Sequence, residues 1–210
     1  MKKKIIIVDD HKLFSHSLKI LVNSFEGFEV SQTFKNGEEL VSYLKNATEF
    51  PEILLLDMRM PKMNGMETME WLKNNLPQQK VLALTVEQED EQIIKMLRLG
   101  CRGYLLKDID PEMFEHALNS TMNTGYFTNK TIADAMSHEE RKKSYKELTG
   151  REMEFLNHAC SEKTYKEVAQ DMNLSPKTVD NYRESLFSKL RVKSRVGLVM
   201  FAIKEGIYKV

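Results

Sequence analysis

The sequence predicts a doubly wound α/β domain with a five-stranded parallel sheet, followed by a small all-α domain. Short apolar segments alternate with amphipathic helical patterns through the first 125 residues, whereas the last 63 residues contain helical patterns alone. The charge also changes along the chain: residues 1–125 contain 15 Lys and Arg against 19 Asp and Glu, and residues 148–210 contain 11 against 8. At 210 residues the chain suits two domains, the second a candidate nucleic-acid binder.

Five short apolar segments are expected to form the strands. They are residues 4–8, 28–34, 52–56, 80–84 and 103–106. Each is followed by a segment with apolar residues at helical spacing, namely 11–23, 37–44, 66–76, 89–99 and 111–121. Because each strand is followed by a helix, the sheet should be parallel, with right-handed crossovers and helices on both faces, as in the flavodoxin-like fold.

Polar side chains stand where these strands end. Asp9 and Asp10 follow the first strand, and Asp57 follows the third. Thr85 stands at the end of the fourth strand, and Lys107 follows the fifth. The carboxyl ends of parallel strands meet at one edge of a sheet, so these groups should line one pocket. Clustered carboxylates need a neutralising cation, and oxygen ligands suit Mg²⁺. Such a site would hold a phosphoryl group for attack by Asp57.

These residues resemble the receiver domain of two-component response regulators. The resemblance rests on "DD" at 9–10, "LLLDMRMPKMNG" at 54–65, "ALT" at 83–85 and "GYLLKD" at 103–108. The one departure is Asp108, where many receivers have proline, and it leaves the isomer of the Lys107–Asp108 bond open.

The resemblance implies a role for each residue. Asp57 would accept a phosphoryl group from a sensor histidine kinase, with help from Thr85 and Lys107. Thr85 and Tyr104 would form the switch that responds to phosphorylation. Mg²⁺ would be held by Asp9, Asp10, Asp57 and the main-chain carbonyl of Met58.

Each piece has a simpler interpretation when it stands alone. A single acid such as Asp57 after a strand is more often a turn or cap residue. Methionines recur every three residues at positions 60, 63, 66 and 69, but packing is favoured over a soft copper site. The five histidines show no metal-ligand pair at helical spacing and are assigned no role.

A rival class of protein is the aspartate-nucleophile phosphatases, which carry a second acid where this chain has Arg59. No enzyme activity is therefore expected beyond self-promoted phosphorylation and dephosphorylation at Asp57.

Residues 126–147 are expected to link residues 1–125 to residues 148–210. Thr128 or Asn129 would cap a short helix, and the hydrophilic residues 137–147 would form a tether.

Residues 148–210 are predicted to contain a helix-turn-helix. Thr149 and Glu152 form a capping-box pattern. A second helix begins near Tyr165, and Ser175 with Pro176 would start a third. The buried stripe of that third helix would contain Val179, Tyr182, Leu186 and Leu190.

This part resembles the LuxR-type DNA-binding domain through "LTGREMEFL", "YKEVAQDMNLSPKTVDNYRESLFSKLRV" and "KSRVGLVMFA". The whole chain therefore looks like a NarL/FixJ-type response regulator, a phosphorylation-controlled regulator of transcription that binds double-stranded DNA. The alternative is a phosphorylated adaptor whose last domain binds protein. The expected DNA-contacting residues are Lys177, Thr178, Asp180, Asn181, Arg183, Glu184 and Lys189.

Two acids on the third helix are unexpected on a face that approaches phosphates. Asp180 and Glu184 would either read bases or pair with Arg183 or Lys177.

In the last helix, Val196, Val199, Met200 and Ile203 are expected to face inward. The opposite face, formed by Leu198, Phe201 and Ala202, would then be the contact of a homodimer, and the alternative is its burial within the same domain or against the receiver.

The remaining features indicate a cytoplasmic protein without a membrane segment. Cys101 and Cys160 are far apart and fit reduced core thiols. The start of the chain is not a signal-peptide pattern, and the longest nearly apolar run, 196–203, is far shorter than the ~20 residues of a membrane span.

Overall fold

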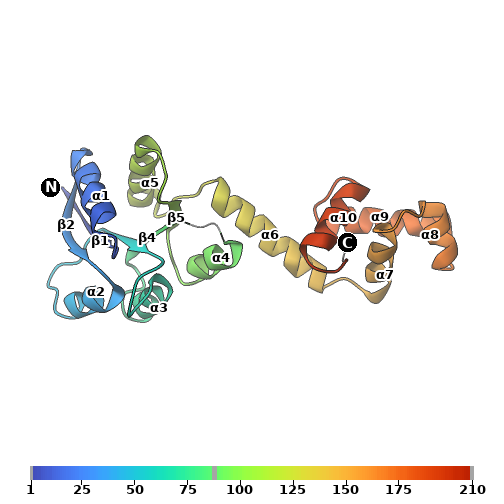
Figure 1. Cartoon of the computed structure of the whole chain (residues 1–210), viewed down its shortest axis with the longest axis horizontal. Coiled ribbons are helices and arrows are strands. Elements are labelled where there is room, and N and C mark those ends of the chain that lie inside the picture. Colours follow the sequence, from blue (N-terminus) through green and yellow to red (C-terminus); the bar gives the residue numbers. More distant parts are fainter. Residues whose placement is uncertain (1, 87–88, 209–210) are drawn as a thin grey trace. The chain divides into compact units, whose positions relative to one another are not determined.

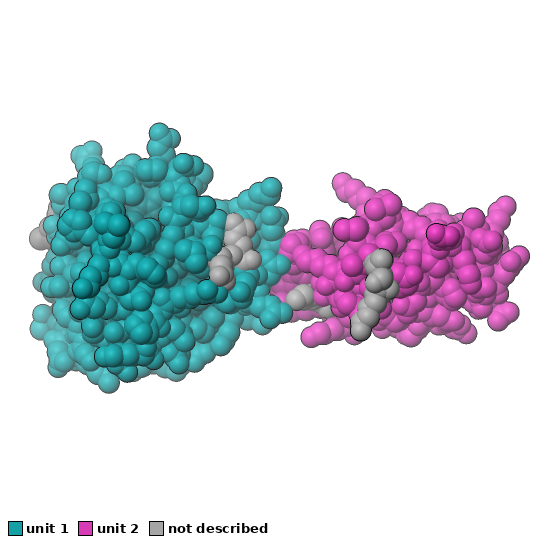
Figure 2. Space-filling model, viewed as in Figure 1, with its two compact units in different colours: residues 1–136 teal, residues 137–210 magenta. Residues whose placement is uncertain are grey.

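Five parallel strands form the central sheet in the N-terminal part of the computed structural model (Figure 1). In spatial order they are β2 (Phe28–Phe34), β1 (Lys3–Val8), β3 (Ile53–Asp57), β4 (Lys80–Thr85) and β5 (Gly103–Leu106). The structure describes residues 2–86 and 89–208. It divides into two compact units, residues 1–136 and residues 137–210 (Figure 2). The predicted doubly wound fold is confirmed in the first unit.

Helices cover both faces of the sheet because successive residues of each strand point to opposite sides. One hydrophobic cluster joins the sheet to α2 (Gly37–Leu44), α3 (Gly65–Asn75) and α4 (Asp90–Arg98). The other joins the sheet to α1 (Lys12–Ser24) and α5 (Pro111–Thr124). The central strand β3 is buried at every position, which explains its continuous apolar run.

The strand order reverses at β1, which lies between β2 and β3. Doubly wound folds bind ligands outside the carboxyl ends of the strands at such a point. Val8 is paired with Leu56 in the β1–β3 register. The residues that follow this pair, Asp9 and Asp57, are therefore delivered side by side at the edge of the sheet.

The segment after α5 differs from the expectation of a short helix and a tether. A single helix, α6 (Lys130–Lys146), runs through both. Asn129 caps it, because its Oδ1 accepts a hydrogen bond from the Ile132 amide at 3.0 Å. Glu, Lys and Arg are strong helix formers, so the scarcity of apolar residues after 136 does not end the helix.

Four helices of the second unit pack around one hydrophobic core. They are α7 (Gly150–Ala159), α8 (Tyr165–Asp171), α9 (Pro176–Lys189) and α10 (Arg195–Lys204). The predicted capping box of Thr149 and Glu152 and the Ser175 cap of α9 are both present. The turn between α8 and α9 contains Asn173 at φ 53, a left-handed conformation that asparagine tolerates. Among the described residues, no helix is long and apolar enough to cross a membrane.

The predicted orientation of α10 is wrong. Leu198, Phe201 and Ala202, expected on the outer face, are buried in the core, whereas Val196, Met200 and Ile203 are exposed. The reason is Arg195, whose guanidinium donates to the carbonyl oxygens of Ala159 at 2.9 Å and Ser161 at 2.7 Å. Arg195, Leu198 and Ala202 lie at i, i+3 and i+7 on one stripe, so these hydrogen bonds turn that stripe inward.

Candidate functional site

Two acids and a lysine meet at the carboxyl edge of the sheet. Asp57 is the last residue of β3 and Asp9 directly follows β1; both are almost fully buried. Lys107, which follows β5, places its Nζ 2.7 Å from Asp9 Oδ2 and 2.9 Å from Asp57 Oδ2. The Lys107 Nζ also lies 4.8 Å from the centroid of the Phe14 ring. The topology thus brings together residues from three strand ends.

The carboxylate of Asp57 is in an unfavourable electrostatic environment. Burial raises its pKa above the ordinary value, and the negative charge of Asp9 raises it further. The hydrogen bond and charge of Lys107 lower the pKa but do not offset these effects. The charged form of Asp57 therefore gains from any additional cation.

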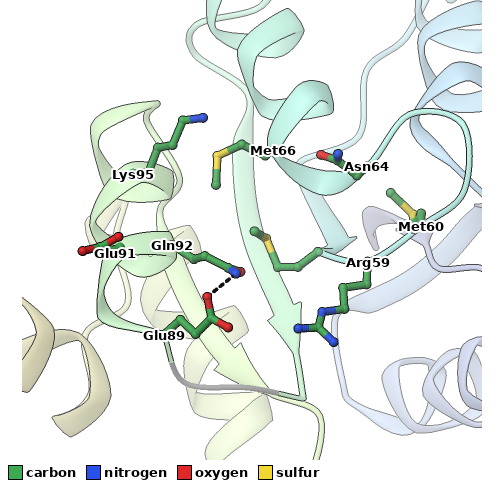
Figure 3. Close-up of a pocket in the computed structure, with 9 residues that line it drawn as sticks. Arg59, Met60, Asn64, Met66, Glu89, Glu91, Gln92 and Lys95 are labelled. Carbon is green, nitrogen blue, oxygen red and sulfur yellow. Dashed lines mark hydrogen bonds between the residues drawn. The ribbon is translucent and has the colours of Figure 1, made fainter.

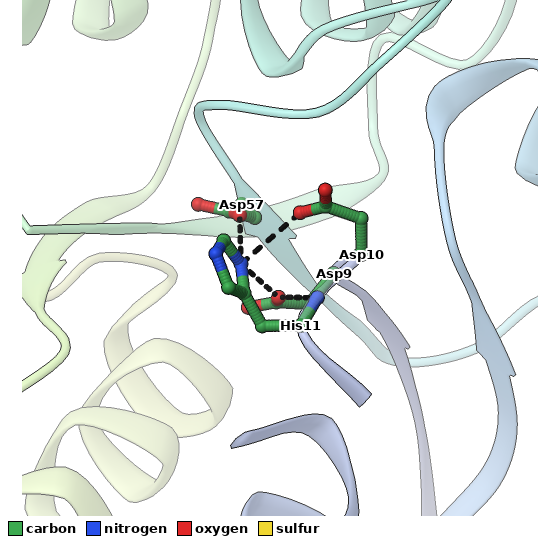
Figure 4. Close-up of side chains that lie close together, drawn as sticks. All are labelled: Asp9, Asp10, His11 and Asp57. Carbon is green, nitrogen blue, oxygen red and sulfur yellow. Dashed lines mark hydrogen bonds and ion pairs between the residues drawn. The ribbon is translucent and has the colours of Figure 1, made fainter. Parts of the chain in front are cut away.

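Asp10 adds a third carboxylate to this group (Figure 4). Asp9 Oδ2, Asp10 Oδ1 and Asp57 Oδ2 are buried, and the contacts that the structure shows for them are ion pairs with Lys107 and His11. The one ammonium of Lys107 leaves a surplus of negative charge among three acids. This set of oxygen donors fits a small divalent cation such as Mg²⁺.

The loop after β3 is packed tightly against this site. The Met58 carbonyl accepts a hydrogen bond from the Gly65 amide at 3.1 Å and retains a second lone pair. A Cβ on Gly65 would lie only 2.4 Å from the Asp57 carbonyl oxygen. Only glycine lets the start of α3 come this close to the end of β3.

One residue of the site, His11, was missed by the sequence interpretation. Its Nδ1 lies 3.2 Å from Asp9 Oδ1, 3.1 Å from Asp10 Oδ1 and 3.7 Å from Asp57 Oδ2 (Figure 4). A search for histidine pairs at helical spacing passes over a histidine that follows an acid pair. The signal that would have found it is its place directly after the same strand end.

The two predicted switch residues, Thr85 and Tyr104, are buried on neighbouring strands. Tyr104 is turned inward, and burial raises the pKa of its hydroxyl, an effect that hydrogen bonding to Thr85 partly offsets. The Asn129 side chain donates to the Tyr104 carbonyl oxygen at 3.1 Å. The Lys107–Asp108 bond is trans, because the described residues contain no cis peptide.

The methionine-rich loop forms one wall of a hollow of about 690 Å³ beside α4 (Figure 3). Met58 and Met60 are buried in the hydrophobic cluster, and Met66 packs against it. This packing favours the interpretation of the methionines as core residues over a copper site.

The predicted DNA-contacting residues lie on α9, most of them exposed. Lys177, Asp180, Asn181 and Glu184 are exposed, and Thr178 is half-buried. Arg183 pairs with Asp180 at 2.8 Å and approaches Glu184 at 3.7 Å. The structure therefore contains the contacts expected if Asp180 and Glu184 pair with Arg183 and do not read bases.

Lys189 is engaged inside its own domain. Its Nζ lies 2.7 Å and 2.9 Å from the two carboxylate oxygens of Glu152. Ser185 Oγ and the amide and hydroxyl of Thr149 also donate to Glu152. Burial raises the pKa of Glu152, but hydrogen bonds from Lys189, Thr149 and Ser185 outweigh it and lower the pKa to about 2. The sequence indicated the capping role of Glu152 but not this ion pair.

Comparison with known proteins gives two family matches. Residues 5–119 match the "Response regulator receiver domain", and residues 146–202 match "Bacterial regulatory proteins, luxR family". The second match supports DNA binding over the alternative of a protein-binding adaptor.

Similar proteins extend over nearly the whole chain. The transcriptional regulatory protein MctR of Rhizobium johnstonii is 27% identical over 98% of this chain and 95% of its own length. Response regulator UvrY of Escherichia coli strain K12 is 28% identical over 97% and 94%. Transcriptional regulatory protein LnrK of Bacillus subtilis is 30% identical over 97% and 98%.

Solved structures agree in fold. The RcsB response regulator of Salmonella typhimurium has a TM-score of 0.62 at 22% identity and covers 97% of this chain and 98% of its own. Another structure shows two RcsB dimers bound to two parallel DNAs, with a TM-score of 0.60 at 22% identity over 97% and 98%. With its receiver domain and its LuxR-type domain, the chain belongs to the two-component response regulators and is a DNA-binding regulator of transcription, not a classical enzyme.

Proposed function

We propose that this regulator is phosphorylated on Asp57 by a sensor histidine kinase and that the phosphoryl group controls its binding to double-stranded DNA. The main support is the buried Asp57 carboxylate, 2.9 Å from the Lys107 ammonium and beside a second buried acid. In the transfer, an Asp57 oxygen bonds to phosphorus while the bond from phosphorus to the donor's imidazole nitrogen breaks. The imidazole keeps that electron pair and takes up a proton.

The neighbouring residues would bind and orient the phosphoryl group. Lys107 would donate to a phosphoryl oxygen, as would the Thr85 hydroxyl. Mg²⁺ supplies positive charge for the phosphoryl oxygens when it is bound. The residues that would hold it are Asp9, Asp10, Asp57 and the Met58 carbonyl.

The phosphoacceptor can be tested directly. Incubation with Mg²⁺ and acetyl phosphate should add one phosphate to the wild-type protein and none to Asp57→Ala, as read by intact mass. Asp108→Ala is the matched control, because Asp108 is exposed and adjoins Lys107. A phosphorylated Asp57→Ala protein would show that the assignment is wrong.

Phosphorylation would reach the rest of the chain through Thr85 and Tyr104. Asn129 binds the Tyr104 main chain, and Ile132 and Ala135 of α6 share the hydrophobic cluster of Tyr104. A shift of Tyr104 would therefore change the packing of the start of α6. Amide hydrogen exchange of residues 129–136 should change on phosphorylation, and unchanged exchange would argue against this route.

We place DNA recognition on α9, with Lys177, Thr178, Asp180, Asn181, Arg183 and Glu184 as contacts. Lys189, also expected from the sequence, is excluded because it pairs with Glu152. Glu184 is exposed, and an acid can accept a hydrogen bond from cytosine N4. Glu184→Gln should then relax selectivity at one base position, by about 1–3 kcal/mol. Selection of bound sites from random DNA, at one salt concentration, measures this. Equal tightening for all sequences would instead indicate that Glu184 only pairs with Arg183.

The exposed face of α10 is the proposed dimer contact, in place of the buried face expected from sequence. Val196 and Met200 are 70% and 62% exposed, and Ile203 lies beside them. Met200→Glu should weaken binding to a two-half-site operator about tenfold or more, because it places a charge in an apolar contact. Since Met200 is exposed in the monomer, thermal stability should not change. Unchanged operator binding would contradict the proposal.

A further inference from the structure

We propose that His11 supplies a nitrogen ligand to the acid site, so that the site binds borderline transition-metal ions such as Co²⁺ more tightly than Mg²⁺. This inference rests on the proposed cation site of Asp9, Asp10 and Asp57, and it concerns which ion that site selects.

The spacing of the donor atoms supports a shared ion. His11 Nδ1 is 3.1 Å from Asp10 Oδ1, 3.2 Å from Asp9 Oδ1 and 3.7 Å from Asp57 Oδ2 (Figure 4). One ligand atom from each of the four residues lies within 4.8 Å of all the others. Neighbouring ligands of an octahedral ion with bonds of about 2.1 Å are about 3 Å apart, so the imidazole stands where a fourth ligand would stand.

Within the described part of the chain, the His11 imidazole neither caps α1 nor belongs to a hydrophobic core. His11 is the N-cap residue of α1, yet its side chain makes no capping hydrogen bond. It is 65% exposed, so core packing does not hold it in place. The main-chain amide of His11 donates to Asp9 Oδ1 at 2.8 Å, and this bond holds the residue next to the acid. The ring turns back toward the carboxylates from a position where it was free to face solvent.

Ligand chemistry then predicts the selectivity. Mg²⁺ prefers oxygen donors and keeps most of its waters, so a nitrogen donor adds little to its binding. Imidazole suits Co²⁺, Ni²⁺, Cu²⁺ and Zn²⁺. A site of three carboxylates and one imidazole should therefore favour these ions over Mg²⁺ more strongly than three carboxylates alone would, and removal of the imidazole should reduce that preference.

The experiment is calorimetric titration of the full chain with MgCl₂ and with CoCl₂ at one pH. His11→Asn should weaken Co²⁺ binding about tenfold or more and leave Mg²⁺ binding within about twofold. The visible Co²⁺ spectrum should change in the same variant, because it reports on the ligand set. Asparagine is a favourable N-cap, so the variant should fold as the wild type does. His16→Asn, one turn further along α1 and exposed, is the control and should change neither affinity.

The outcomes separate this inference from the proposed cation site. Equal loss of Mg²⁺ and Co²⁺ binding in His11→Asn, or no loss, would overturn the selectivity. Tighter binding of both ions would also overturn it, because His11 would then be a competing cation. Asp10→Ala should weaken both ions in either case. If it weakens neither, the cation site itself is wrong.

Discussion

Asp57 in the receiver domain and Glu152 in the DNA-binding domain are both buried carboxylates beside a lysine. Their surroundings, however, shift the two pKa values in opposite directions. Asp57 shares the single ammonium of Lys107 with Asp9. Glu152 has Lys189 to itself and accepts further hydrogen bonds from Ser185 and Thr149. Accordingly, the pKa of Asp57 is raised, and that of Glu152 is lowered to about 2.

The comparison shows that an acid next to a lysine is not in itself a stabilising pair. What decides is the number of donors per negative charge. Glu152 is fully satisfied and ties the start of α7 to α9. Asp57 is crowded by other acids, so its charge is available to a cation or a phosphoryl group.

The largest effect on the free energy of unfolding is expected when Glu152, whose carboxylate accepts hydrogen bonds from Lys189, Ser185 and Thr149, is replaced. Lowering the pKa of Glu152 from 4.5 to about 2 corresponds to about 3 kcal/mol of stability for the DNA-binding domain at neutral pH. Glu152→Gln should lose stability of that order, measured as the free energy of unfolding of this domain in the full chain. Glu154→Gln is the control, since Glu154 pairs with Arg151 on the surface, and should cost less than about 1 kcal/mol.

The pH dependence sharpens the same prediction. A depressed carboxyl pKa stabilises the folded state above the ordinary pKa, and this stability is lost as the pH falls from 4.5 toward about 2. The wild-type domain should therefore lose more stability than Glu152→Gln over that range. Parallel pH profiles of the two proteins would contradict the pKa assignment.

A smaller effect of opposite sign is expected in the receiver domain. Because the pKa of Asp57 is raised, its charged form costs stability at neutral pH, and this cost disappears as the pH falls. In metal-free buffer, Asp57→Asn should unfold at a higher temperature than the wild type, and the difference should shrink on acidification. Asp108→Asn, at an exposed position, should show no such shift. A less stable Asp57→Asn would mean that attraction to Lys107 outweighs the crowding of acids.

The sequence predicts the sheet well because β1, β3, β4 and β5 are mostly buried and contain continuous apolar runs. The meeting of Asp9, Asp57 and Lys107 follows from the rule that parallel strands end at one edge. Periodicity did not predict the rotation of α10, because both faces are apolar and the rotation depends on Arg195. It also missed the pairing of Lys189 with Glu152, which are 37 positions apart, because single-sequence patterns detect only local neighbours.

The contact of α6 with Tyr104 has a practical consequence for dividing the chain. Ile132 and Ala135 are buried in the same hydrophobic cluster as Tyr104, and Phe127 is buried in the cluster that contains α5. All three lie beyond residue 119, where the match to the receiver family stops. A fragment that ends at Gly125 would lack Ile132 and Ala135, so the apolar surface around Tyr104 would be exposed to solvent and prone to aggregate. A fragment that ends at Met136 retains both residues. The signalling domain is thus longer than the family match, and chimeras with other output domains should be joined after Met136, where the two compact units divide.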